Sequence, residues 1–105
     1  MAKIKLYKND NLVLEHDGDT QDNNLLVFEN IVYDPNKFIL IRENDDFKFE
    51  LDFKCSLAII TLKKEGHSLD LNLSNVKKEI GNDSHKIYYN IESEEVISNV
   101  LEITF

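Results

Sequence analysis

The sequence predicts an all-β protein, a single antiparallel meander that closes into a small barrel of about eight or nine short strands. Three observations support this. Polar and apolar residues alternate with a period of two along most of the chain, as they do at Phe47–Lys54. Turn-forming residues separate these segments at short intervals, and no segment is long enough to be a crossover helix between parallel strands. An open row of strands would leave two unpaired edges, and closure removes them.

The first half of the chain supplies four expected strands. Ile4 and Leu6 alternate with lysines, and Asn9–Asn11 provides a turn before a second strand. An acidic, Asn-rich stretch then reads as a loop, and Asp34–Asn36 forms a turn because Pro35 fixes its backbone dihedral. The expected strands are residues 3–6, Leu12–His16, Leu25–Tyr33 and Phe38–Glu43, with the loop at Asp17–Asn24.

The second half supplies the clearest alternation. Phe47, Phe49, Leu51 and Phe53 share one face of a fifth strand, and Gly66 can take the positive φ of a hairpin turn. The further strands expected are Leu57–Lys63, Leu69–Leu73, Ile87–Glu92 and Val100–Phe105. Residues 75–80 fit either a strand or a short helix capped by Ser74 and Gly81, and the strand is favoured because strands surround it. Ser93–Ser98 is expected to be a loop or bulged hairpin.

Length, charge and cysteine content exclude several classes of protein. A chain of 105 residues is expected to form one domain, residues 1–105. With 12 Lys and Arg against 20 Asp and Glu, the net charge is −8. Nucleic-acid binding is therefore not expected, because it requires positive side chains that contact the phosphate backbone. One cysteine, no apolar leader and no membrane-length apolar stretch together favour a cytoplasmic protein. The acidic residues read mainly as a solubilising coat.

The order of strands resembles the YwiB-like family of small bacterial proteins, whose fold is a calycin, or lipocalin-like, β-barrel. The resemblance rests on Ile39–Glu43, the Phe47–Phe53 strand, the hairpin that turns at Gly66, and the segments Ile87–Ile91 and Leu101–Phe105. It implies a barrel of unknown function. The chain departs from the family in being shorter and in having lysine where the family tends to have arginine at Lys63–Gly66. Because it has no tryptophan, it also lacks the Gly-x-Trp signature of true lipocalins.

No constellation of residues points to catalysis or to a metal. Asp17 and Asp19 have the spacing that opens an EF-hand loop, but Gln21 occupies the next ligand position, so a solvated loop is expected. The three histidines lie apart at expected turns and strand ends, which favours scattered surface positions. A catalytic thiol at Cys55 would need a nearby histidine and a polarising environment, and a small buried hydrophobe explains the residue as well. We therefore predict no catalytic residue, no metal ligand, no cofactor and no enzymatic activity.

Three segments are apolar on both faces, which is typical of strands that are covered on both sides. They are Leu25–Phe28, Phe38–Ile41 and Leu57–Ile60. Either the outer face meets a second subunit or another protein, or the inner face lines a cavity for a small apolar ligand. The large side chains available favour a filled barrel, so a binding or interaction module of unknown partner is the leading hypothesis and a ligand carrier the alternative.

Three residues are candidate ligand-binding positions: Arg42, Glu43 and Tyr89. Arg42 and Glu43 would act as polar anchors if they point into a cavity and would form an ordinary surface ion pair if they do not. Tyr88 and Tyr89 beside Lys86 also suggest a second alternative, a platform for single-stranded nucleic acid on an OB-like barrel. The net charge argues against it.

Overall fold

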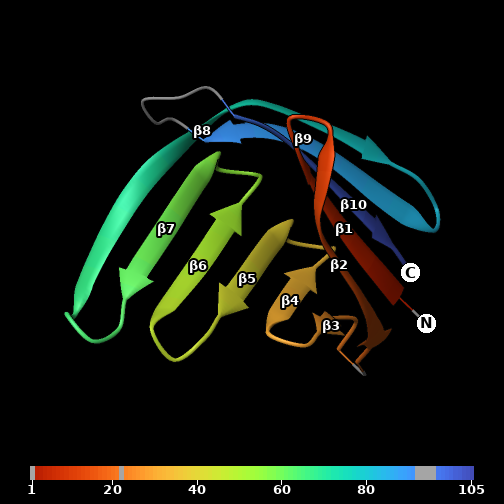
Figure 1. Cartoon of the computed structure of the whole chain (residues 1–105). Coiled ribbons are helices and arrows are strands. Elements are labelled where there is room, and N and C mark those ends of the chain that lie inside the picture. The colour runs from red at the N-terminus through yellow and green to blue at the C-terminus, as the bar shows by residue number, and fades with distance from the viewer. Residues whose placement is uncertain (1, 22, 92–96) are drawn as a thin grey trace.

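A computed structural model describes residues 2–21, 23–91 and 97–105, and these residues form a closed antiparallel barrel of ten strands without a helix (Figure 1). The all-β class and the closed meander are confirmed, and the strand count is higher than predicted. The strands are β1 (Ala2–Lys8), β2 (Asn11–Thr20), β3 (Leu26–Phe28), β4 (Ile31–Asp34), β5 (Ile39–Glu43), β6 (Phe47–Asp52), β7 (Leu57–Leu62), β8 (His67–Ile80), β9 (Ser84–Ile91) and β10 (Ser98–Thr104).

Each strand pairs with its neighbours in the chain, and the barrel closes where β1 pairs with β10, with Ile4 opposite Ile103. Two long strands carry the sheet around its corners. The first half of β8 pairs with β7 and the second half with β9, and the register shifts between Ser74 and Lys77. Asn75, inside this shift, has a φ of 52°. β2 pairs in the same divided way with β1 and then β3, so the two halves of the barrel cross at a large angle (Figure 1).

The structure corrects two predicted boundaries and decides one open question. The expected strand Leu25–Tyr33 is two strands, β3 and β4, joined at Glu29 and Asn30, where Glu29 has a φ of 50°. The expected loop Asp17–Asn24 begins later, because β2 continues to Thr20. Residues 75–80 belong to β8, so the strand is confirmed and the helix alternative is wrong. Most of the expected Ser93–Ser98 loop lies outside the described residues.

The core follows from the alternation along each strand. The inward side chains of β1, β9 and β10 are buried except for Leu6 and Ile91, which are partly buried, and most of those of β3 to β7 are buried as well, while their neighbours face outward. The largest fully buried side chains are Tyr33, Phe28, Phe53, Ile4, Leu26, Ile31, Leu51, Ile87 and Ile103. Cys55 is exposed in the turn between β6 and β7, so its interpretation as a buried hydrophobe is wrong. None of the described residues forms a helix with the length and apolar character needed to cross a membrane.

Candidate ligand-binding site

The inner wall of the barrel has two neighbouring rows of side chains, one that is largely buried and one that is partly exposed to solvent. Two adjacent rows of inward side chains cross β4 to β8 in register. The residues of the first row, Tyr33, Leu40, Leu51, Ala58 and Leu71, are buried except for Leu71, which is partly buried. The second row, called the inner row below, consists of Ile31, Arg42, Phe49, Ile60 and Leu69.

Burial decreases along the inner row from β4 to β8. Ile31 is buried, Phe49 and Ile60 are partly buried, and Leu69 is 57% exposed. Exposure also increases along β8 from Leu73 toward Leu69, since Leu73 is 5% exposed, Leu71 is partly buried and Leu69 is largely exposed. The end of the barrel formed by the turns at residues 9–10, 44–46 and 63–66, called the open end below, therefore leaves part of its apolar inner wall uncovered.

Arg42 lies on this inner wall. Leu40 and Arg42 point inward from β5, and Ile39, Ile41 and Glu43 take the alternate positions. The Nε atom of Arg42 is buried and has no hydrogen-bond partner, and no ion pair among the described residues includes this guanidinium. A buried donor without a partner costs about 1–3 kcal/mol, so it is an uncommon feature that calls for an acceptor.

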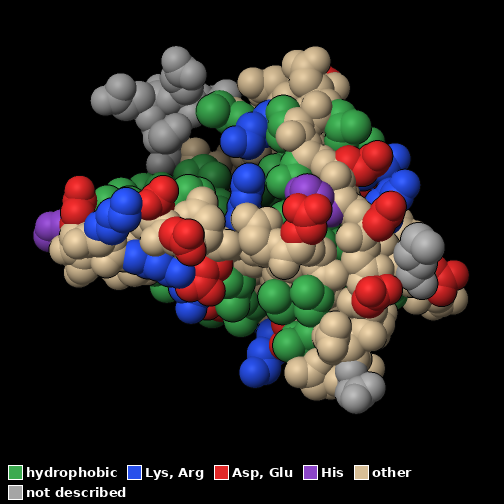
Figure 2. Space-filling view, turned by 60° about the horizontal axis from the view of Figure 1, so that its bottom comes forward, with side chains coloured by type: hydrophobic (Ala, Val, Ile, Leu, Met, Phe, Trp, Pro, Cys, Tyr) green, Lys and Arg blue, Asp and Glu red, His purple; other side chains and the backbone are tan. Residues whose placement is uncertain are grey.

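A small apolar cavity is lined in part by Arg42. Its volume is about 40 Å³, and apart from Arg42 and Tyr89 its lining is apolar: Ile4, Leu6, Leu14, Ile31, Leu40, Phe49, Leu51 and Leu101. Ligand cavities of roughly 300 Å³ or more are usual for enclosed small molecules. The barrel is thus largely filled, as the large side chains predicted, and the space beside Arg42 admits only part of a ligand. In the space-filling view, hydrophobic and cationic side chains are visible together in a recess (Figure 2).

The three candidate residues separate in the structure. Arg42 and Tyr89 both line the cavity. Tyr89 packs against Phe53, with ring centroids 5.2 Å apart, and burial raises the pKa of its hydroxyl, which stays protonated at neutral pH. Glu43 lies outside, where its carboxylate is 2.6 Å from Lys63 Nζ, and this hydrogen bond lowers its pKa. Neighbouring residues of a strand face opposite sides, so Arg42 and Glu43 could not both be anchors.

Aromatic side chains close the other end of the barrel. Tyr33 Oη and His85 Nδ1 are 2.7 Å apart in the interior. The imidazole of His85 stacks on Phe38 and meets the edge of Phe105, with centroid distances of 5.4 and 5.0 Å. Burial lowers the pKa of His85 and raises that of Tyr33, so both rings are neutral near pH 7 and share one hydrogen bond between Oη and Nδ1. The prediction of a surface position is therefore wrong for His85, which is buried, whereas His67 is exposed.

This buried histidine predicts a loss of stability at mildly acidic pH. Because the pKa of His85 is lower in the folded than in the unfolded protein, the unfolded chain binds the proton more readily. Its contribution is complete above about pH 6.5 and is lost as the pH falls through the folded value. The free energy of unfolding of the wild type should therefore decrease relative to that of His85→Gln between pH 7 and 5.5, as measured by urea unfolding. A constant difference between the two proteins over this range would contradict the assignment.

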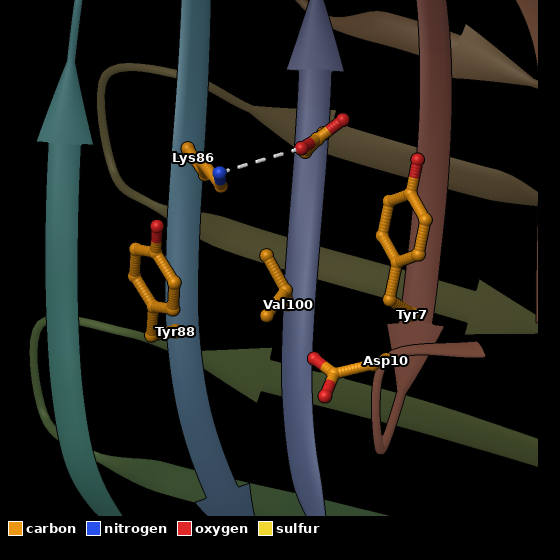
Figure 3. A pocket seen from close by; sticks show the side chains of 6 residues that line it. Tyr7, Asp10, Lys86, Tyr88 and Val100 are labelled. Carbon is orange, nitrogen blue, oxygen red and sulfur yellow. Dashed lines mark ion pairs between the residues drawn. The ribbon is translucent and has the colours of Figure 1, made fainter. Parts of the chain in front are cut away.

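The outer face of β1, β9 and β10 carries a shallow hollow of about 310 Å³ (Figure 3). Tyr7 and Tyr88 flank Val100 in register across the three strands. Lys86 lies 3.6 Å from Glu102, and Lys3 and Lys5 pair with Asp17 and Glu15. Tyr88 faces outward and Tyr89 inward, so the two tyrosines do not form one platform. The paired lysines leave little free positive charge for a nucleic acid.

The outer sides of the three doubly apolar segments are only partly exposed. Val27, Val32 and Ile41 lie side by side across β3, β4 and β5, and each is partly buried. On β6 the corresponding outward residue is Glu50, which ends this apolar strip before Ile59 of β7. The possible homodimer or protein partner at Leu25–Phe28, Phe38–Ile41 and Leu57–Ile60 stays a prediction.

Potential metal ligands do not gather in the part of the chain that the structure describes. No group of three or more His, Cys, Asp or Glu side chains there could hold an ion. Asp17 belongs to β2 and lies 3.7 Å from Lys3 Nζ, so it is part of the sheet surface and not of an acidic loop.

Comparisons of the chain with protein-family models, curated proteins and solved structures find no match. The geometry of the barrel interior is therefore the main source of functional information. The sequence suggested Arg42 and Tyr89, but neither the doubly apolar segment before Leu62 nor the alternation around Leu69 indicates that these two leucines are uncovered.

Proposed function

We propose that this chain is a non-enzymatic binding module that holds a small, largely apolar molecule at the open end of its barrel. The observation that carries the proposal is the uncovered apolar inner wall, on which Leu62 and Leu69 are 42% and 57% exposed. Removing apolar surface from water is favourable by about 25 cal/mol per Å². A ligand that covers these two leucines is therefore stabilised by the surface it buries. The cavity beside Arg42 continues this wall into the interior.

A cytoplasmic location is part of the proposal. The exposed thiol of Cys55 has no partner cysteine in this sequence, and such a thiol persists best in a reducing compartment. Membership of the YwiB-like, calycin-type family would also agree with an unassigned ligand-binding role, since barrels of one fold serve unrelated functions.

The proposal predicts binding of a neutral apolar probe. N-phenyl-1-naphthylamine should bind with micromolar affinity and show enhanced fluorescence, because the inner wall shields it from water. Leu69→Glu should weaken this binding at least tenfold by placing a carboxylate on the wall. Leu12→Glu is the matched control: Leu12 is 50% exposed but lies opposite Tyr7, on the outer face.

Both variants should retain the wild-type circular dichroism spectrum, since both leucines are already exposed. Absence of enhanced fluorescence with the wild type, or equal weakening by the two substitutions, would count against the open end as the binding site.

A further inference from the structure

We propose that Arg42 is a head-group site, and that the ligand is an amphiphile with a single carboxylate whose aliphatic chain extends toward the open end. This inference rests on the proposed function and specifies its ligand. It begins from Arg42, which lines a cavity formed otherwise by apolar side chains and Tyr89, and whose buried Nε lacks a hydrogen-bond partner. A folded protein seldom keeps such a donor unless an acceptor occupies the space beside it.

The chemistry of the cavity favours an anion of one charge. Among the described residues that line the cavity, Arg42 alone is charged, so a singly charged head is neutralised and a dianion is not. A guanidinium presents its N–H groups in a planar fork that matches the two oxygens of a carboxylate. Tyr89 of β9 also lines the cavity, and because its hydroxyl stays protonated at neutral pH it adds no further charge.

The size of the cavity limits what can enter it. About 40 Å³ accommodates a compact planar group, and an aliphatic chain does not fit in the same space. The chain must therefore leave the cavity along an apolar surface. The chain cannot extend toward the opposite end of the barrel. The buried row from Tyr33 to Ala58 and the aromatic cluster around His85 fill the interior there.

The inner row supplies the remaining path. From Arg42 it continues in register through Phe49 and Ile60, which are partly buried, to Leu69, which is 57% exposed. Adjacent strands lie about 4.8 Å apart, so the path from β5 to β8 is about 14 Å long. A medium-length aliphatic chain laid across these side chains covers the part of the wall that water now contacts.

The test compares decanoate with decanol, two probes with the same chain and different head groups, by isothermal titration at neutral pH. The wild type should bind decanoate at least tenfold more tightly than decanol. Arg42→Met should lose this preference, through at least a tenfold loss of affinity for decanoate and less than a twofold change for decanol. Arg42→Lys, which keeps the charge without the fork, should retain part of the preference.

Lys37→Met is the matched control, since it removes one positive charge from an exposed turn distant from the cavity. It should bind both probes as the wild type does. Equal binding of decanoate and decanol by the wild type, unchanged decanoate binding by Arg42→Met, or tighter binding of decyl phosphate than of decanoate would overturn the carboxylate site. In those cases N-phenyl-1-naphthylamine would still bind. If it also failed to bind, the proposed function itself would be refuted.

Discussion

Gly18→Ala is expected to destabilise the barrel by about 3 kcal/mol, because the added methyl group has no space. A Cβ at this position would lie 2.2 Å from the carbonyl oxygen of Val27 and 2.5 Å from a ring carbon of Phe28. Gly18 faces Ala2 on the inner side of β2, where β3 crosses closely over the strand. Relief requires movement of the β3 backbone. Thermal unfolding should show a decrease in Tm of more than about 10 °C.

Gly81→Ala provides the control for this substitution. A Cβ there would meet its nearest atom, the hydroxyl oxygen of Ser84, at 3.4 Å, close to an ordinary contact. Its Tm should stay within a few degrees of the wild type. Similar losses for the two variants would mean that the close approach of β3 to Gly18 is not what constrains β2.

Leu73→Ala is expected to cost about 3 kcal/mol, whereas Leu69→Ala, four residues earlier on the same face of the same strand, should cost less than about 1 kcal/mol. The difference follows from burial, since Leu73 is 5% and Leu69 57% exposed. Removing a buried leucine side chain leaves a cavity, and removing an exposed one does not. Urea unfolding of both variants measures the two free energies.

This pair of substitutions also tests how the barrel is divided. A cost for Leu69→Ala as large as that for Leu73→Ala would show that the open end is packed in solution, and the inner wall would then not be free to receive a ligand. A small cost for both would mean that β8 contributes little to the core.

The sequence was sufficient for the fold class because alternation dominates it. The Phe47–Phe53 pattern, for example, is the inner and outer face of β6. The boundary errors have local causes. Glu29 adopts a left-handed conformation without a glycine or proline to announce the turn between β3 and β4. Asp17–Thr20 looks like a loop because acids and a glycine cluster there, although Gly18 is the residue that lets β3 approach β2.

The candidate site was predictable only in part. Arg42 shares the face of Leu40 by alternation, so its inward position follows once Leu40 is known to be inward. The sequence alone did not show which face of β5 points inward, because Ile39 and Ile41 make the other face apolar as well. The uncovered wall at Leu69 depends on which strands pair over which lengths, and β8 leaves β7 to join β9 only in the folded structure. No local pattern records that change of partner.

The position of a bound apolar molecule is the most direct test of a binding site inside the barrel. Methyl resonances of Leu, Ile and Val would be recorded by NMR as N-phenyl-1-naphthylamine is added to the wild type. We expect the largest shifts at Leu14, Ile60 and Leu69, which line the cavity or the inner row, and little change at Leu12 and Val13 on the outer face. Shifts confined to the outer face, including the apolar strip of Val27, Val32 and Ile41, would contradict a binding site inside the barrel.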